Sequence, residues 1–401
     1  MELSHEGRHE LSLIINSQKK FEPIDFLEDS VVQDIRKYHA TIPGYAETPL
    51  VSLDALADNL GVNKIFVKDE SYRFSLNAFK SLGVSYAVGK LLQEKLDFQD
   101  QELTYQVLCS PRIKAIVSTM TFITATDGNH GRGLAWFANK LGADSVILMP
   151  KNSVQARVEA IARENSRVIV TDLNYDDAVR KAYKMAEENN WILVQDTAWE
   201  GYTKIPSWIT QGYATMSLEA LEQIEASGEK LPTHVFLQAG VGSMAGSVLG
   251  ILLNRAGEDL PRTVIIEPKQ AACIFESAKI NDGHAHAATG NHQTMMAGLA
   301  CGEINVEIWP ILRDFSYGYI SCSDSLAVEG MKRLANPMGS DSKIVSGESG
   351  AVGIGLLETL SKDIDLADMK TELGLDENSV VLILSTEGDT DPENYSRIVT
   401  G

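Results

Sequence analysis

Short apolar runs alternate with amphipathic stretches along most of this 401-residue chain. The runs are rich in β-branched residues and apolar at successive positions, which is typical of strands buried on both faces. Between them lie stretches such as Tyr175–Asn189 and Leu218–Ala226, which have helical length and an amphipathic pattern. The alternation predicts an α/β fold with mainly parallel sheets and right-handed crossovers. The predicted strands are Ser145–Pro150, Arg167–Thr171, Trp191–Gln195, His234–Gln238, Thr263–Glu267 and Val380–Leu384.

The composition restricts the partners of the chain. A content of 44% hydrophobic and 22% charged residues is ordinary for a globular protein, and the length suffices for two packed domains. A net charge of −20 leaves no basic face for nucleic acid or an anionic membrane. Residues 1–20 lack the apolar core of a signal peptide, and no apolar run reaches membrane-spanning length. We therefore expect a cytoplasmic protein with neither nucleic acid nor a membrane as its partner.

The cysteines and histidines do not form a metal-binding pattern. The four cysteines are widely separated without a CxxC motif, although a disulfide between Cys273 and Cys301 stays open. Residues 281–292 contain three histidines, but no Asp or Cys is spaced to complete a metal site. We predict that this segment is a flexible loop and that residues 98–113 are a polar insertion. Long loops of this kind often act as active-site lids.

A glycine-rich segment at residues 240–246 follows one predicted strand and begins a predicted helix. Glycines let backbone N–H groups approach an anion, and the helix N-terminus adds a favourable dipole. The segment also fits the G-x-G-x-x-A pattern of dinucleotide-binding folds, with Glu267 at the end of the next strand as the ribose-binding acid. It predicts a phosphate site and, taken alone, slightly favours a dinucleotide.

Lys80 and Asp127, upstream of this segment, indicate a function only when they are considered together with it. Lys80 begins an otherwise apolar helix, and Asp127 lies in the turn Thr126-Asp127-Gly128-Asn129-His130-Gly131. In isolation, Lys80 is interpreted as a solvated helix residue and Asp127 as a turn former or helix cap. With the glycine segment, they indicate an enzyme in which a lysine forms a Schiff base with a phosphate-bearing cofactor.

In this order, Lys80, the Asp-Gly-Asn-His-Gly turn and the glycine segment resemble the fold-type II pyridoxal-phosphate enzymes, which include serine and threonine dehydratases. The resemblance runs from about Tyr45 to Thr390, most of the chain. It is most specific for the diaminopropionate ammonia-lyase family, because four strings match that family. These strings are Phe79-Lys80, Thr126–Gly133, Val194–Tyr202 and Ser385–Thr390. The resemblance implies pyridoxal 5'-phosphate as the cofactor, an amino acid as the substrate and a homodimer.

The resemblance also implies how the cofactor is held. Lys80 forms the Schiff base, Asn129 bonds the ring hydroxyl, Thr386 faces the pyridine nitrogen and Glu348 borders the ring. An apolar setting is expected to lower the pKa of Lys80 and leave a neutral nucleophile. The implied cofactor-binding residues are Phe79, Lys80, Asn129, Gly240, Val241, Gly242, Ser243, Glu348 and Thr386.

The acidic residues indicate which group leaves the substrate. A dehydratase must protonate a departing hydroxide and tolerates a serine at the position of Asp127. An ammonium group needs anions beside it, because a buried cation must be paired. Asp127 and Asp196 are the candidates, so we predict elimination from 2,3-diaminopropionate to pyruvate and two molecules of ammonia. Lys80 and Asp127 are the predicted bases for the two enantiomers, and Tyr175 is a candidate pocket residue.

Three other interpretations compete with this one. A serine or threonine dehydratase is the nearest, and Asp127 argues against it. An NAD-dependent dehydrogenase explains Gly240, Gly242 and Glu267 but gives Lys80 and Asp127 no role. A non-catalytic binding protein gives no reason for the glycines and paired acids to occur together.

The domain division follows the resemblance. Residues 1–80 and 196–401 are expected to form a large cofactor-binding domain, and residues 81–195 a small αβ domain. The cofactor is expected in the cleft between them, at the carboxyl ends of parallel strands.

Overall fold

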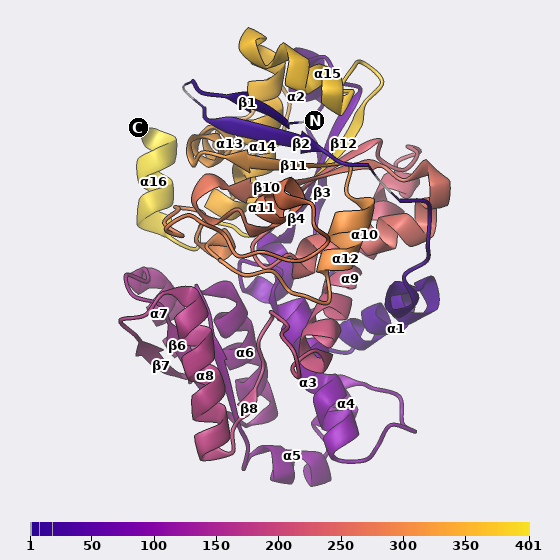
Figure 1. Ribbon diagram of the computed structural model, residues 1–401. Coiled ribbons are helices and arrows are strands. Elements are labelled where there is room, and N and C mark those ends of the chain that lie inside the picture. Colours follow the sequence, from indigo (N-terminus) through magenta and orange to yellow (C-terminus); the bar gives the residue numbers. More distant parts are fainter. Residues whose placement is uncertain (1, 8, 18) are drawn as a thin grey trace.

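Two β-sheets organise the protein (Figure 1). The structure is a computed structural model that describes residues 2–7, 9–17 and 19–401. The large sheet has the order β1-β2-β11-β10-β9-β12-β4-β3, and the small sheet has the order β7-β6-β5-β8. The strands are β1 (Glu2–His5), β2 (Leu11–Ile15), β3 (Leu50–Ser52), β4 (Lys64–Asp69), β5 (Thr121–Ala125), β6 (Asp144–Met149), β7 (Arg167–Val170), β8 (Ile192–Leu193), β9 (His234–Gln238), β10 (Arg262–Pro268), β11 (Gly318–Cys322) and β12 (Val380–Ser385).

Parallel pairing dominates, which confirms the predicted α/β fold. All pairs of the small sheet are parallel, and so are the pairs that join β11, β10, β9, β12 and β4 in the large sheet. Antiparallel strands flank this parallel centre, because β2 pairs with β11 and β3 pairs with β4. The sequence pattern did not predict these flanking strands.

Helices cover both faces of the large sheet, which explains the continuous apolar strands. Along β9, Val235 and Leu237 belong to one core cluster and Phe236 belongs to the other. Because side chains alternate between faces, both alternating sets must be apolar. The helices are α1 (Asp29–Ala40), α2 (Asp54–Leu60), α3 (Ser81–Lys95), α4 (Tyr105–Leu108), α5 (Pro111–Val117), α6 (Asn129–Leu141), α7 (Gln155–Ala162), α8 (Tyr175–Asn189), α9 (Lys204–Ala226), α10 (Ser243–Ala256), α11 (Cys273–Ile280), α12 (Trp309–Phe315), α13 (Ser325–Ala335), α14 (Glu348–Lys362), α15 (Ala367–Leu373) and α16 (Pro392–Thr400).

Most predicted elements occur close to their expected positions. β9 and α8 have the predicted bounds, whereas α9 begins well before the predicted Leu218. The expected insertion at residues 98–113 is partly helical, because α4 and the start of α5 lie within it. Residues 281–292 form a loop without helix or strand, as predicted. Within the described residues, no helix combines the length and apolar character needed to cross a membrane.

The two sheets occupy different parts of the molecule. Every strand of the small sheet lies between residues 121 and 193, and α6, α7 and α8 pack against that sheet. In Figure 1 this layer lies below the large sheet, and the contacting helices α3 and α9 lie to its right. The carboxyl ends of β5 and β9 therefore lead into loops that approach the same region.

A fully buried network of charged side chains lies between the large sheet and α9. The guanidinium of Arg73 donates to Glu70 at 2.8 Å and to Glu219 at 2.7 Å. Lys68 pairs with the same Glu219 at 2.8 Å, and all four side chains are inaccessible to solvent. Burial acts to raise the pKa of Glu219, but the hydrogen bonds and charges of Arg73 and Lys68 lower it overall. The carboxylate is therefore ionised and fully paired.

This network holds a strained turn that leads to Lys80. Phe74, Ser75 and Asn77 have positive φ angles of 50°, 58° and 62°, a conformation that non-glycine residues rarely adopt. The backbone N–H of Gly388 donates to the Asn77 carbonyl at 3.0 Å. The Arg73 network at one end and this contact at the other offset the cost of the turn.

We expect removal of the central charge of this network to destabilise the protein strongly. Glu219→Gln leaves two buried cations with one fewer anion, which costs about 3–5 kcal/mol in the free energy of unfolding. Urea unfolding measures the change. The control is Glu159→Gln, whose exposed partner Arg163 lies 3.5 Å away, and it should leave stability nearly unchanged. Equal stability of the two variants would contradict this interpretation.

Candidate active site

The loops at the carboxyl ends of the strands enclose a small inner pocket. All the site residues predicted from the sequence line it except Glu348. The lining comprises Phe79, Lys80, Asp127, Asn129, Tyr175, Asp196, Tyr213, Gln238, Ala239, Gly240, Val241, Gly242, Ser243, Met244, Ala245, Gly298, Leu299, Cys301, Ser349, Thr386 and Glu387. The fold therefore brings together residues that are more than 300 positions apart in the sequence.

An ion pair between Lys80 and Asp196 lies in this pocket. Lys80 precedes the first residue of α3, and its Nζ lies 2.6 Å from an oxygen of the buried Asp196. Burial acts to lower the pKa of Lys80, but the charge and hydrogen bond of Asp196, together with Tyr213 and Asp127, raise the pKa overall. The expectation of a lowered lysine pKa is therefore wrong for the free amine, because the setting is charged rather than apolar.

The carboxyl group of Asp196 has several hydrogen-bond donors. Tyr175 Oη donates to its Oδ1 at 3.1 Å, and Gln195 Nε2 lies 3.2 Å from the same oxygen. Burial acts to raise the pKa of Asp196, but the charge of Lys80 and these partners lower it overall. His130 Nδ1 lies 3.7 Å from the other oxygen without a hydrogen-bond partner, and burial lowers the pKa of that histidine. Asp196 is thus an ionised, buried carboxylate.

Asp127 is the second carboxylate of the pocket and has fewer partners. It lies between β5 and α6, and among the described residues only the hydroxyl of Thr126 donates a hydrogen bond to its side chain, at 3.5 Å. Burial raises its pKa, while the charges of Lys80 and Arg157 act in the opposite direction. A carboxylate with a raised pKa and little hydrogen bonding is well suited to accept a proton.

The glycine segment connects β9 to α10 and forms one wall of the pocket. Gly242 has a φ of 93°, and a Cβ on it would lie 2.8 Å from Leu312. Ser243 Oγ donates to the Asp196 carbonyl at 2.8 Å, so this segment also fixes the chain that carries the carboxylate. The backbone N–H groups at the start of α10 provide the predicted type of anion site.

The remaining predicted residues have partners inside the protein. The amide of Asn129 donates to Glu387 at 2.5 Å, and the hydroxyl of Thr386 accepts from Gln238 at 3.0 Å. The ring of Phe79 packs against Tyr213, with centroids 4.8 Å apart. Sequence reasoning missed Glu387 and Tyr213 as pocket residues, although Glu387 lies within the matching Ser385–Thr390 string.

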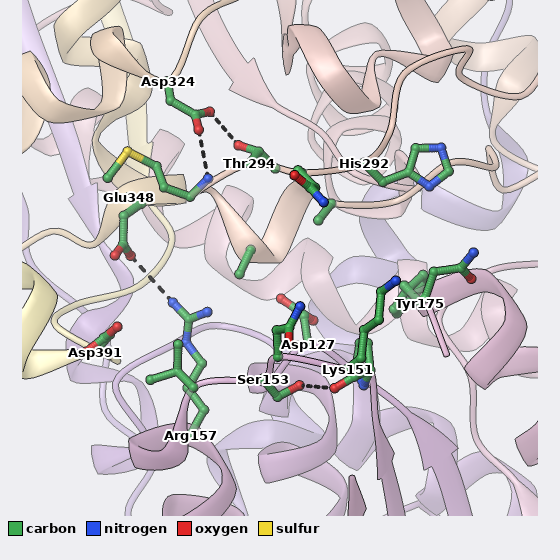
Figure 2. A pocket seen from close by; sticks show the side chains of 18 of the residues that line it. Asp127, Lys151, Ser153, Arg157, Tyr175, His292, Thr294, Asp324, Glu348 and Asp391 are labelled. Carbon is green, nitrogen blue, oxygen red and sulfur yellow. Dashed lines mark hydrogen bonds and ion pairs between the residues drawn. The ribbon is translucent and has the colours of Figure 1, made fainter. Parts of the chain in front are cut away.

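Glu348 lies in an outer cavity of about 850 Å³ instead of the inner pocket. Its carboxylate lies 3.5 Å from Arg157 and accepts from Asn394 at 2.5 Å. Asp127 and Tyr175 line both spaces, so the outer cavity adjoins the inner pocket at these residues. Figure 2 shows this cavity with its small-sheet side below and its large-sheet side above. Asp127, Arg157 and Tyr175 are labelled on the small-sheet side, and Thr294, Asp324 and Glu348 on the large-sheet side.

Glu267 has a structural role at the start of a helix, and the cysteines are not paired in disulfides. The carboxylate of Glu267 accepts backbone N–H groups of Ile274 at 2.9 Å and Phe275 at 2.6 Å, in the first turn of α11. It caps a helix, so the feature that favoured a ribose-binding acid has another explanation.

All four cysteines are free thiols, so Cys273 and Cys301 do not form a disulfide in this structure.

A family model for pyridoxal-phosphate dependent enzymes matches residues 41–385 of the chain. The chain belongs to this family, which agrees with a reactive lysine, a glycine-rich anion site and parallel strands around one pocket. The NAD-dependent dehydrogenase interpretation is excluded by this membership.

Comparison with individual proteins shows which members of the family this chain resembles. A diaminopropionate ammonia-lyase of Salmonella typhimurium is 48% identical over 94% of this chain and 93% of its own length. The Escherichia coli diaminopropionate ammonia-lyase, solved with an aminoacrylate–pyridoxal-phosphate azomethine intermediate, has a TM-score of 0.90 at 47% identity, covering 97% of this chain and 96% of that chain. A threonine deaminase of Solanum lycopersicum shares the fold, with a TM-score of 0.68 at 17% identity, covering 96% of this chain and 97% of that chain. Within the family, this chain therefore groups with the diaminopropionate ammonia-lyases, which are carbon–nitrogen lyases of fold-type II.

The inner pocket fits pyridoxal phosphate, the cofactor of this family. Three buried polar atoms in its wall lack a hydrogen-bond partner, namely Tyr213 Oη, Gln238 Oε1 and Ser349 Oγ. Buried polar groups are normally paired, so this cluster indicates a polar ligand. A Cβ on Gly298 would lie 3.1 Å from Ser349 Oγ and 3.4 Å from Asp127 Oδ2, so glycine keeps this space open. The lysine, the anion site and the unpaired atoms match the aldehyde, the phosphate and the polar ring of the cofactor.

The buried Glu267 predicts a specific pH dependence of stability. Burial raises the pKa of Glu267 to about 8, although its backbone hydrogen bonds act to lower it. Because the folded protein holds this proton more tightly than the unfolded chain, stability is highest below the ordinary pKa and falls as the pH rises toward about 8. We expect urea unfolding to show a smaller loss of stability between about pH 5 and about pH 8 for Glu267→Gln than for the parent. The exposed Glu159→Gln control should keep the parent slope, and a parent slope for Glu267→Gln would refute the expectation.

Proposed function

We propose that this enzyme catalyses α,β-elimination of ammonia from 2,3-diaminopropionate, after which water hydrolyses the released aminoacrylate to pyruvate and a second molecule of ammonia. Two carboxylates, Asp127 and Asp196, line the pocket that contains Lys80, and this arrangement carries the proposal. The similarity to diaminopropionate ammonia-lyases over nine-tenths of the chain supports the same reaction.

The charge on Asp196 supports a cationic substrate. Lys80 neutralises this buried carboxylate as an ammonium group, but it must be neutral to act as a base, and it then no longer supplies that positive charge. A buried carboxylate without a counter-ion is costly, so the site then favours a ligand that brings a cation. The β-ammonium of diaminopropionate is such a cation, whereas the hydroxyl of serine is not. This contrast favours the ammonia-lyase over the serine or threonine dehydratase.

Lys80 and Asp127 are the proposed bases. When bound, the cofactor ring accepts the electron pair that remains after the substrate Cα–H bond breaks. Lys80 removes that proton from one enantiomer, and Asp127 removes it from the other. The raised pKa of Asp127, which burial causes, makes this carboxylate a stronger base than an ordinary aspartate. Asp196 holds the β-ammonium and keeps it oriented as ammonia leaves.

The proposal also covers the domain organisation of the enzyme, its oligomeric state and its location in the cell. Residues 1–80 and 196–401 act as the cofactor-binding domain, and residues 81–195 as a small domain that closes over the substrate. The resemblance supports a homodimer in the cytoplasm. Light scattering on the purified enzyme tests the dimer, and a monomer at assay concentration would reject it.

Pyruvate formation from the separate enantiomers tests the reaction and its bases. The parent should produce pyruvate from diaminopropionate faster than from serine. Asp127→Asn should reduce turnover of one enantiomer by about 10²-fold or more and spare the other, because only one depends on this base. Lys80→Ala should abolish turnover of both. Equal losses for both enantiomers in Asp127→Asn would reject the assignment of separate bases.

Substrate preference tests the role of Asp196. Asp196→Asn removes the anion but keeps the shape, so kcat/KM for diaminopropionate should fall by about tenfold to 10²-fold. The value for serine should fall less, because its hydroxyl carries no charge. The ratio of the two kcat/KM values is the measurement, and an unchanged ratio would show that Asp196 does not recognise the ammonium.

A further inference from the structure

Gln195 connects the two halves of the candidate site and has no role in the reaction described so far. It follows β8, and its side chain is completely buried. Its Oε1 accepts from Thr124 Oγ1 at 2.8 Å and from the backbone N–H of Ala125 at 3.0 Å. Its Nε2 lies 2.9 Å from Tyr175 Oη and 3.2 Å from Asp196 Oδ1. One amide group therefore contacts β5, α8 and the buried carboxylate.

The surroundings fix the orientation of this amide. The backbone N–H of Ala125 is always a donor, so the side-chain oxygen must face β5. The NH₂ group then necessarily faces Tyr175 and Asp196. Because Tyr175 Oη accepts from Gln195, its own proton is directed to Asp196 Oδ1, 3.1 Å away. Asp196 Oδ1 thus receives two donors whose directions both depend on Gln195.

We propose that Gln195 is a positioning residue for the substrate ammonium. It keeps Asp196 ionised and oriented when Lys80 no longer pairs with it, and it ties Asp196 to the strand that ends two residues before Asp127. The two carboxylates are thereby held at a fixed separation. This inference rests on the proposed function, because it concerns how the β-ammonium is recognised.

Two substitutions of similar size distinguish this role from simple packing. Gln195→Met keeps the length and loses both hydrogen-bonding ends. Gln195→Glu keeps the acceptor facing Ala125, and its protonated form also supplies a donor toward Asp196. Burial beside another carboxylate raises the pKa of such a glutamic acid. The Glu variant should therefore work at low pH and fail as the pH rises, when two carboxylates repel each other.

The pH response involves every titratable group around Asp196. These groups are Lys80 before α3, Asp127 after β5, His130 on α6, Tyr175 on α8, Tyr202 before α9, Tyr213 on α9 and Cys301 in the inner pocket. All of them are also present in the parent. The ratio of variant to parent KM at each pH therefore isolates the change at position 195.

The experiment measures KM and kcat for diaminopropionate on the holoenzymes across the neutral pH range. Loss of a hydrogen bond to a charged group corresponds to about ten- to hundredfold, so Gln195→Met should raise KM by about that factor at every pH. Gln195→Glu should approach the parent KM near about pH 6 and exceed it by about tenfold or more near about pH 8.5. kcat/KM for serine should change less than that for diaminopropionate in both variants. The control is Gln93→Glu, because Gln93 is also buried and hydrogen-bonded, to the Gln101 carbonyl at 2.8 Å, but lies outside the site.

Each outcome separates the inference from the proposed function. If both variants of Gln195 raise KM equally at all pH values, or match Gln93→Glu, the positioning role is overturned while the reaction stands. If the parent forms no pyruvate from diaminopropionate, the proposed function itself fails. The cofactor absorbance band and the unfolding midpoint verify that each variant is folded and loaded.

Discussion

The carboxylate of Asp196 lies in the protein interior, where an ionised group is stable only if cations and hydrogen-bond donors surround it. Lys80 from the start of α3, Tyr175 from the start of α8 and Gln195 beside it supply these partners. Each partner comes from a different element. The pairing of one buried charge therefore requires α3, α8 and the end of β8 to meet, and this requirement defines the geometry of the inner pocket.

The same requirement links binding to chemistry. While Lys80 is charged, it compensates the buried negative charge of Asp196. When Lys80 no longer carries that charge, the carboxylate requires another cation. In the proposed reaction, the site thus exchanges the ammonium group of Lys80 for the ammonium group of the substrate. Asp127, with a single hydroxyl contact at 3.5 Å, remains less constrained and free to change its protonation state.

The sequence predicted six of the parallel strands, but neither the parallel strands β4, β5 and β11 nor the flanking strands. β9 and α8 were found at their predicted bounds because burial on two faces or on one helical face leaves a strong local pattern. β1 and β3 are short, and their pairing partners decide their structure rather than their own composition. Among the residues that line the inner pocket, the motifs predicted the lysine, the two aspartates and the glycine segment, but not Tyr213, Ser349 or Glu387. Glu348 lies elsewhere because its contact with Arg157, 191 positions away, leaves no local signal.

The strained turn before Lys80 has a consequence for biosynthesis. Arg73 depends on Glu219, which follows it by 146 positions, and Ala78 forms a β-bridge with Glu387 close to the end of the chain. A nascent chain that has passed Lys80 therefore still lacks the residues that hold this lysine in place. We therefore expect Lys80 to reach its folded position only when nearly the whole polypeptide has been synthesised. A chain truncated before Glu387 is expected to lack one of the contacts that hold this lysine in place.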